Sequence, residues 1–175
     1  MYDQQTVYLN DWNAGYRHPV VTKNYDDIQT FTGDNYANTR GALVLHMLRK
    51  HLGDDVWWKA IKYYMQNNSG KLRTTADFQK SIEQSSGENL DWFFDQWIYK
   101  MGHPVFEVSK QYDKVKHQLV LNIKQTQTTD KNNAYPQTVF YRGKMDIEVD
   151  DSVYKVWIAP QADNIFTFTS AQMPL

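Results

Sequence analysis

The histidines are the first residues to examine for metal chemistry, because the chain contains five His and no Cys. His46 and His51 lie five residues apart, which on a helix separates their side chains by roughly 140° around the axis. Two helical ligands of one ion need a spacing of three or four residues, as in H-E-x-x-H. His18, His103 and His117 have no His partner at this spacing. We therefore predict no structural metal site, and expect His46 to be a hydrogen-bonded core histidine.

Other catalytic and ligand-binding patterns are missing or have simpler interpretations. The sequence contains neither the G-x-S-x-G of a nucleophile elbow nor the G-x-x-x-x-G-K of a phosphate loop. The acidic pairs Asp26-Asp27, Asp54-Asp55 and Asp150-Asp151 are adjacent residues, whose side chains diverge on any regular element. We interpret Asp54-Asp55 as helix-start charge and Asp150-Asp151 as a turn. A carbohydrate-stacking set is conceivable among four tryptophans, but most lie on apolar helical stripes and we expect burial: Trp57, Trp58, Trp92 and Trp97.

The composition is that of an ordinary folded protein without a nucleic-acid face. The 175 residues are 41% hydrophobic, 22% charged and 15% aromatic, which is enough to bury a sizeable core. The formal net charge is −1, and positive and negative side chains are balanced in both halves, which argues against neutralisation of nucleic-acid phosphates. No apolar run approaches the length of a membrane span, and the lack of Cys leaves the cellular compartment open.

Helical patterns dominate the first hundred residues. Residues 1–35 are polar and irregular, with a short helix expected near residues 5–12. Residues 39–51 are apolar almost all round, which is typical of a buried helix. The next helix begins at Asp54 and has an apolar stripe at helical spacing, formed by Trp57, Ala60, Ile61, Tyr64 and Met65.

Two further helices are expected before residue 103. Thr74 followed by Asp77 is a capping-box pattern, and it opens a helix with Phe78 and Ile82 facing inward. Asn89 is the expected N-cap of the last helix. Its apolar stripe contains Leu90, Phe93, Phe94, Trp97, Ile98 and Met101.

Strand patterns replace the helical ones after Gly102 and Pro104. Short apolar or alternating runs lie between turn-forming clusters, at residues 105–108, 116–124, 138–141, 144–149, 153–158 and 165–169. Such spacing is typical of an antiparallel sheet or sandwich. We therefore expect an α+β fold, with an N-terminal α-helical subdomain of about four main helices (1–103) and a C-terminal antiparallel β-sandwich-like domain (104–175).

The order of these segments resembles the zinc aminopeptidases of the aminopeptidase-N type, the M1 peptidase family of gluzincins. The similarity runs from about Tyr16 to Val108 and is carried by YRHPVV (16–21), TRGALVLHMLRKHLGDD (39–55) and TTADFQKSIEQSSGENLDWFFDQWIYKMGHPVFEV (74–108). Each segment is modest alone, but their order and spacing make the match strong. The resemblance implies the C-terminal part of a thermolysin-like catalytic domain followed by a β-domain.

The resemblance also implies a hydrolase that removes N-terminal residues from peptides. In the family, H-E-x-x-H and a later Glu bind zinc, and the Glu of the motif activates the metal-bound water. No His-Glu dipeptide occurs in this sequence, so those ligands and that base are absent from it. We expect a fragment that is inactive alone, with zinc in the full-length parent and no cofactor in this chain. The alternative is a non-catalytic interaction module derived from the same scaffold.

The resemblance assigns one catalytic role within this chain. A family Tyr donates a hydrogen bond to the developing oxyanion, and it lies three residues before the Gly of a Tyr-Glu-Lys-Gly-Ala-like motif. Here that stretch begins with Asn38, and Tyr36 stands two residues earlier, so Tyr36 is our candidate oxyanion donor; otherwise it is a packing or turn Tyr. Within a helix this offset rotates the side chain by about 200°, whereas in a loop it need not matter. Arg40 and Gly41 match the motif, and we expect them to serve helix entry.

Peptide substrates of the parent are the partners that the resemblance implies. We expect no nucleic-acid partner and no membrane segment in this chain. In the parent these helices would pack against the zinc-bearing helices, so a truncated piece should expose an apolar face and self-associate through it. The resemblance is compatible with an extracytoplasmic or cell-envelope location of the parent, but does not decide it.

Overall fold

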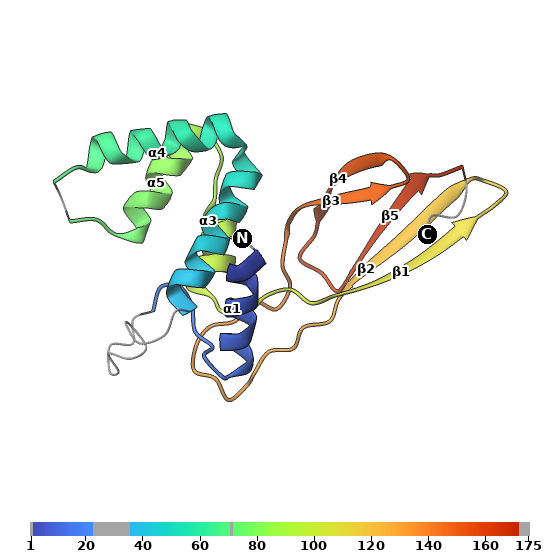
Figure 1. Ribbon diagram of the computed structural model, residues 1–175, viewed down its shortest axis with the longest axis horizontal. Coiled ribbons are helices and arrows are strands. Elements are labelled where there is room, and N and C mark those ends of the chain that lie inside the picture. Colours follow the sequence, from blue (N-terminus) through green and yellow to red (C-terminus); the bar gives the residue numbers. More distant parts are fainter. Residues whose placement is uncertain (1, 23–35, 71, 172–175) are drawn as a thin grey trace. The chain divides into compact units, whose positions relative to one another are not determined.

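The computed structural model describes residues 2–22, 36–70 and 72–171, and the chain divides into two compact units, Met1–Gly102 and His103–Leu175. The first unit is helical and the second is built of antiparallel strands (Figure 1). This confirms the predicted α+β fold. No helix in the described ranges is long and apolar enough to cross a membrane.

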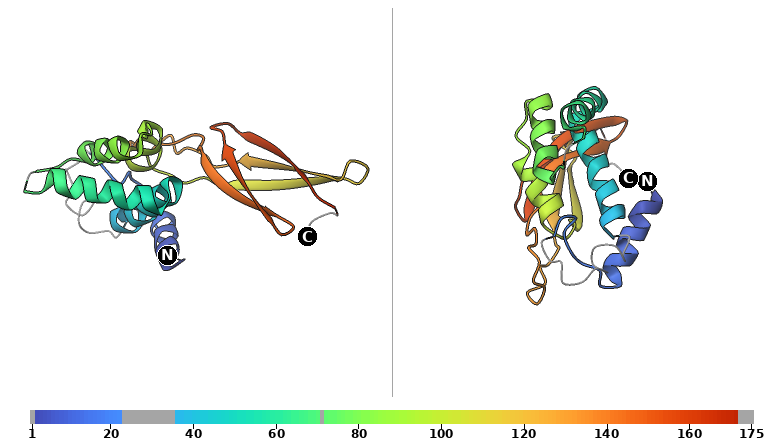
Figure 2. Two further views of the ribbon diagram at one scale, coloured as in Figure 1. Left: turned by 90° about the horizontal axis from the view of Figure 1, so that it is seen from above. Right: turned by 90° about the vertical axis from the view of Figure 1, so that its left-hand side faces the viewer.

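The helical unit is a set of short helices joined by tight connections. Its elements are α1 (Tyr2–Asn13), α3 (Tyr36–Leu52), α4 (Asp54–Asn68), α5 (Thr75–Ser86), α6 (Asp91–Phe94) and the π-helical η1 (Asp95–Tyr99). In Figures 1 and 2, α1 lies along α3, and α4 lies beside α5. The predicted short helix near residues 5–12 is therefore present as α1, and it is longer than expected.

The core of this unit gathers one apolar stripe from each of the later helices. Their period of 3.6 residues brings side chains three or four positions apart to the same face. The buried cluster contains Val44 and Leu48 from α3, Trp57 and Ala60 from α4, Ile82 from α5, and Leu90, Phe93, Phe94 and Ile98 from the last helical segment. Trp92 and Trp97 are partly buried against it.

Local capping signals fix where the helices begin and end. Gly53 joins α3 to α4 with a φ of +83°, a conformation that only glycine adopts without strain. The predicted capping box is confirmed, because the Thr74 side chain accepts from the Asp77 N–H and the Asp77 carboxylate accepts from the Thr74 N–H. Asp54 and Asp55 occupy the first turn of α4, as the sequence predicts.

Three expectations about the helix faces are wrong. Leu45 is 40% exposed and Met65 is 63% exposed, although both lie on patterns that predict burial. His46 is partly exposed and does not belong to the core. The reason is that the neighbouring described helices cover only one side of α3 and α4, and an apolar sequence pattern does not show whether a partner is present.

The last helical segment departs from regular α geometry. The sequence predicts one α-helix with Asn89 as its N-cap, whereas α6 begins at Asp91 and passes into the π-helical turn η1. Asn89 Oδ1 accepts from the Asp91 N–H at 3.1 Å, so it still binds the first helical residue. The wider turn brings the polar Gln96 into the interior, where it is 4% exposed.

The β unit contains two antiparallel sheets. Strands β1 (Phe106–Asp113), β2 (Gln118–Gln125) and β5 (Asp163–Thr169) form a sheet in the order β1-β2-β5, and β3 (Gly143–Val149) pairs with β4 (Ser152–Ile158). The two-residue connection Asp150-Asp151 is a turn, as predicted, with a φ of +54° at Asp150. Leu119 and Leu121 of β2 pack against side chains of the other strands: Val149, Phe168, Tyr112, Ile147, Tyr154, Val156 and Phe166. The unit is therefore two sheets packed face to face.

One predicted strand is absent. Residues 138–141 are irregular, yet Tyr141 is only 2% exposed. Its N–H donates to Gln125 Oε1 at 2.8 Å, and Gln125 Nε2 donates to its carbonyl at 2.7 Å. A side-chain amide thus pairs with this backbone in place of a neighbouring strand. The alternation of apolar residues cannot distinguish these two arrangements.

Candidate functional site

The first turns of α3 carry the residues that the sequence assigns to the oxyanion site. Tyr36 is the first residue of α3, and its side chain lies outside the described residues. Asn38 belongs to the same helix and is exposed. Because both positions are helical, their Cα–Cβ directions differ by about 200° around the axis. The role of Tyr36 stays a prediction.

Arg40, one turn further along α3, is buried and binds the end of the last helical segment. Its exposed fraction is 2%. Nη1 donates to Gly102 O at 2.7 Å and to the Tyr8 hydroxyl at 3.0 Å. Nη2 donates to Lys100 O at 3.2 Å and to Trp97 O at 3.3 Å. A single side chain therefore joins α1, α3 and the segment that follows η1.

These contacts satisfy groups that a helix end leaves free. The last carbonyls of a helix have no partner within it and carry partial negative charge, so a guanidinium is well suited to bind them. The guanidinium carbon also lies 5.6 Å from the centroid of the Tyr8 ring, in a cation–π contact. Nε of Arg40 is buried without a hydrogen-bond partner in the part of the chain that the structure describes. Arg40 therefore does more than serve helix entry, because it also binds α1 and the end of the last helical segment.

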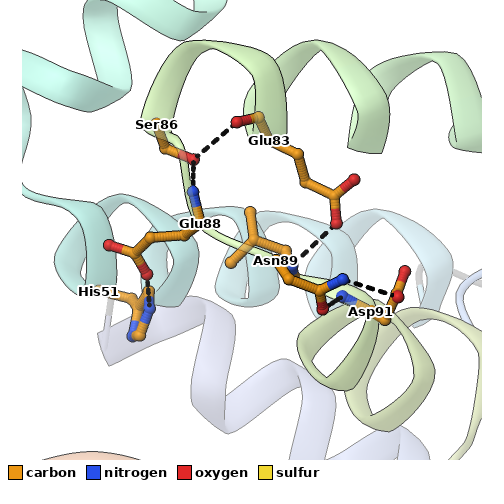
Figure 3. Close-up of polar contacts among 7 residues, drawn as sticks. His51, Glu83, Ser86, Glu88, Asn89 and Asp91 are labelled. Carbon is orange, nitrogen blue, oxygen red and sulfur yellow. Dashed lines mark hydrogen bonds and ion pairs between the residues drawn. The ribbon is translucent and has the colours of Figure 1, made fainter.

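His51 connects the end of α3 to the segment between α5 and α6. Its Nε2 lies 2.9 Å from Glu88 Oε2 (Figure 3). Its ring packs edge-on against Trp92, with centroids 5.4 Å apart. In the same segment, Glu83 Oε1 accepts from the Leu90 N–H at 2.8 Å. These contacts hold a connection between helices.

The remaining histidines of the metal search are dispersed. His18 is buried, and its Nδ1 lies 2.8 Å from Pro19 O. Burial lowers the pKa of His46, and the nearby Lys50 and Arg49 lower it further. No group of three or more His, Asp or Glu side chains within the described ranges could hold a metal ion. The described residues therefore contain no cluster that fits a zinc site.

An exposed polar and aromatic cluster lies at the junction of α3 and α4. Arg49 forms a two-point ion pair with Asp54, with Nε–Oδ1 and Nη2–Oδ2 distances of 2.8 Å. Its guanidinium also lies 5.2 Å from the centroid of the Trp58 ring. The hydrogen bonds from Arg49 hold the pKa of Asp54 below its ordinary value. Trp58 is 56% exposed, so the expectation that the tryptophans are buried is wrong for this residue.

The sequence contains a signal for only part of this arrangement. Arg40 belongs to a quoted motif, but its partners lie 32 to 62 residues away and are mostly backbone carbonyls. Every residue has a backbone carbonyl, so residue types could not have revealed these contacts. The capping box, by contrast, involves two side chains three residues apart, and its signal is complete in the sequence.

The comparisons with known proteins agree on one family. Residues 1–97 match the family model described as the Peptidase family M1 domain. The chain is 28% identical over 151 residues to the "Probable aminopeptidase 2" of Sulfurisphaera tokodaii, covering 85% of this chain and 18% of that protein. It is 31% identical over 125 residues to the "Aminopeptidase N" of Haemophilus influenzae, covering 70% of this chain and 14% of that protein.

A solved structure shares the fold. The chain aligns with the crystal structure of Legionella pneumophila aminopeptidase A in complex with aspartic acid, with a TM-score of 0.70 and 19% identity, covering 90% of this chain and 18% of that one. The chain thus spans less than a fifth of the length of these relatives. The family model covers more than half of the chain, and the residues that it matches, 1–97, lie within the helical unit. The chain therefore belongs to peptidase family M1.

Proposed function

We propose that the chain is part of a zinc-dependent aminopeptidase that removes N-terminal residues from peptides, and that it is inactive by itself. The observation that carries this proposal is the M1 family match over residues 1–97 in a chain without a His-Glu dipeptide. In this proposal residues 1–103 are the C-terminal helical part of a thermolysin-like domain, and residues 104–175 are the following β-domain. Zinc is held by residues outside this chain.

In this proposal the chain mainly holds parts of the catalytic domain in place, and Tyr36 is the one residue that takes part in catalysis directly. Arg40 fixes the first turns of α3 against the end of η1, so the helix that carries Tyr36 has a defined position. Tyr36 donates a hydrogen bond to the developing oxyanion of the peptide substrate. A hydroxyl aimed at developing charge lowers the barrier only if its helix does not move, which is what the Arg40 contacts ensure.

The proposal is tested with the purified chain and aminoacyl p-nitroanilides, with and without added zinc. We expect no hydrolysis above the rate of buffer and no stoichiometric zinc after dialysis. The control is a family member that carries H-E-x-x-H, assayed in the same buffers. Hydrolysis by the pure chain that a chelator abolishes would show that the proposal is wrong.

The alternative is a non-catalytic interaction module built on the same scaffold. The observation that favours it is Asn38 at the position of the family Tyr. The amide of Asn is a weaker hydrogen-bond donor than the phenol of Tyr, and its side chain is shorter. An H-E-x-x-H motif in the reading frame upstream of residue 1, followed by a Glu, would decide for the enzyme. Self-association through an exposed helical face also stays a prediction, and Leu45 and Trp58 are the exposed apolar residues on which it would depend.

A further inference from the structure

We draw no further inference here: the strongest candidate, the exposed surface cluster of Arg49, Asp54 and Trp58 at the junction of α3 and α4, carries none because nothing in the structure shows what covers it.

Discussion

At the scale of single residues, Arg40 does more for the helical unit than any other polar side chain described above. It is buried, and its four terminal N–H groups bind three carbonyls and one phenol. Its partners within the described residues are not carboxylates, so no second charge had to be desolvated. Charge-assisted hydrogen bonds of this kind are about twice as strong as neutral ones.

Replacing Arg40 should therefore destabilise the unit strongly. We expect R40A to lower the free energy of unfolding by about 3 kcal/mol or more, because it removes the donors to three partly buried carbonyls and to the Tyr8 hydroxyl. R40K should lose less, since an ammonium reaches one or two of these acceptors but lacks the planar fork. Urea unfolding measures both, with K50A on the exposed side of α3 as the control. Equal stability of R40A and K50A would contradict this account.

The role of Tyr36 can be measured only where zinc is present. A suitable background is a chimera in which the matching segment of Haemophilus influenzae aminopeptidase N is replaced by this chain. We expect Y36F to lower kcat by about 10² with little change in KM, which is typical of losing one oxyanion donor. N38A is the matched control and should keep activity. The opposite result, with N38A inactive and Y36F active, would assign the donor to Asn38.

At the scale of elements, the capping box of α5 makes stability depend on pH. Hydrogen bonds from the Thr74 backbone and side chain hold the pKa of Asp77 below its ordinary value of 3.8. A carboxyl whose pKa is depressed in the folded state contributes its full stabilisation above the unfolded pKa and loses it as the pH falls through the folded pKa. The same holds for Asp54 beside Arg49 and for Asp113 in the β1–β2 turn. Acid should therefore destabilise the chain below about pH 4.

Thr74 separates this effect from general acid unfolding. We expect T74A to cost about 1 kcal/mol at pH 7 through loss of the cap. It should also raise the pKa of Asp77 part of the way toward its ordinary value, because it removes the side-chain hydrogen bond and keeps the larger backbone one. The carboxyl carbon shift in an NMR titration reports this pKa. T75A, one residue later in the first turn of α5, is the control. An Asp77 pKa that does not move in T74A would contradict the contribution of the Thr74 hydroxyl.

The same elements show how far sequence reasoning reaches. Thr74, Gly53 and the Trp57–Ala60 stripe are local signals, and the structure contains the caps, turn and buried face that they predict. The π-helical turn η1 has no such local signal, because the apolar spacing of its segment is that of an ordinary α-helix. The predicted burial of Leu45 is wrong for a different reason. An apolar residue can be buried, but burial requires a neighbouring element that covers it.

At the scale of the whole molecule, the chain spans less than a fifth of the relatives that it matches. Several apolar residues are exposed, as expected if the chain is only part of a larger structure. Leu45 on α3, Trp58 on α4 and Val108 on β1 are all exposed. In a longer protein such positions are natural places for further contacts. The proposed inactivity of the isolated chain agrees with the small share of those relatives that it spans.

The contacts of Arg40 also impose an order on synthesis. Gly102 lies 62 residues after Arg40, and a ribosome adds roughly 5–20 residues per second. Arg40 and Tyr8 are therefore synthesised several seconds before Gly102, the last residue whose carbonyl accepts from Arg40. During that interval Arg40 can bind Tyr8 of α1 but not the carbonyls at the end of the last helical segment. The helical unit of the nascent chain can close only when the first residues of the β unit are already being translated.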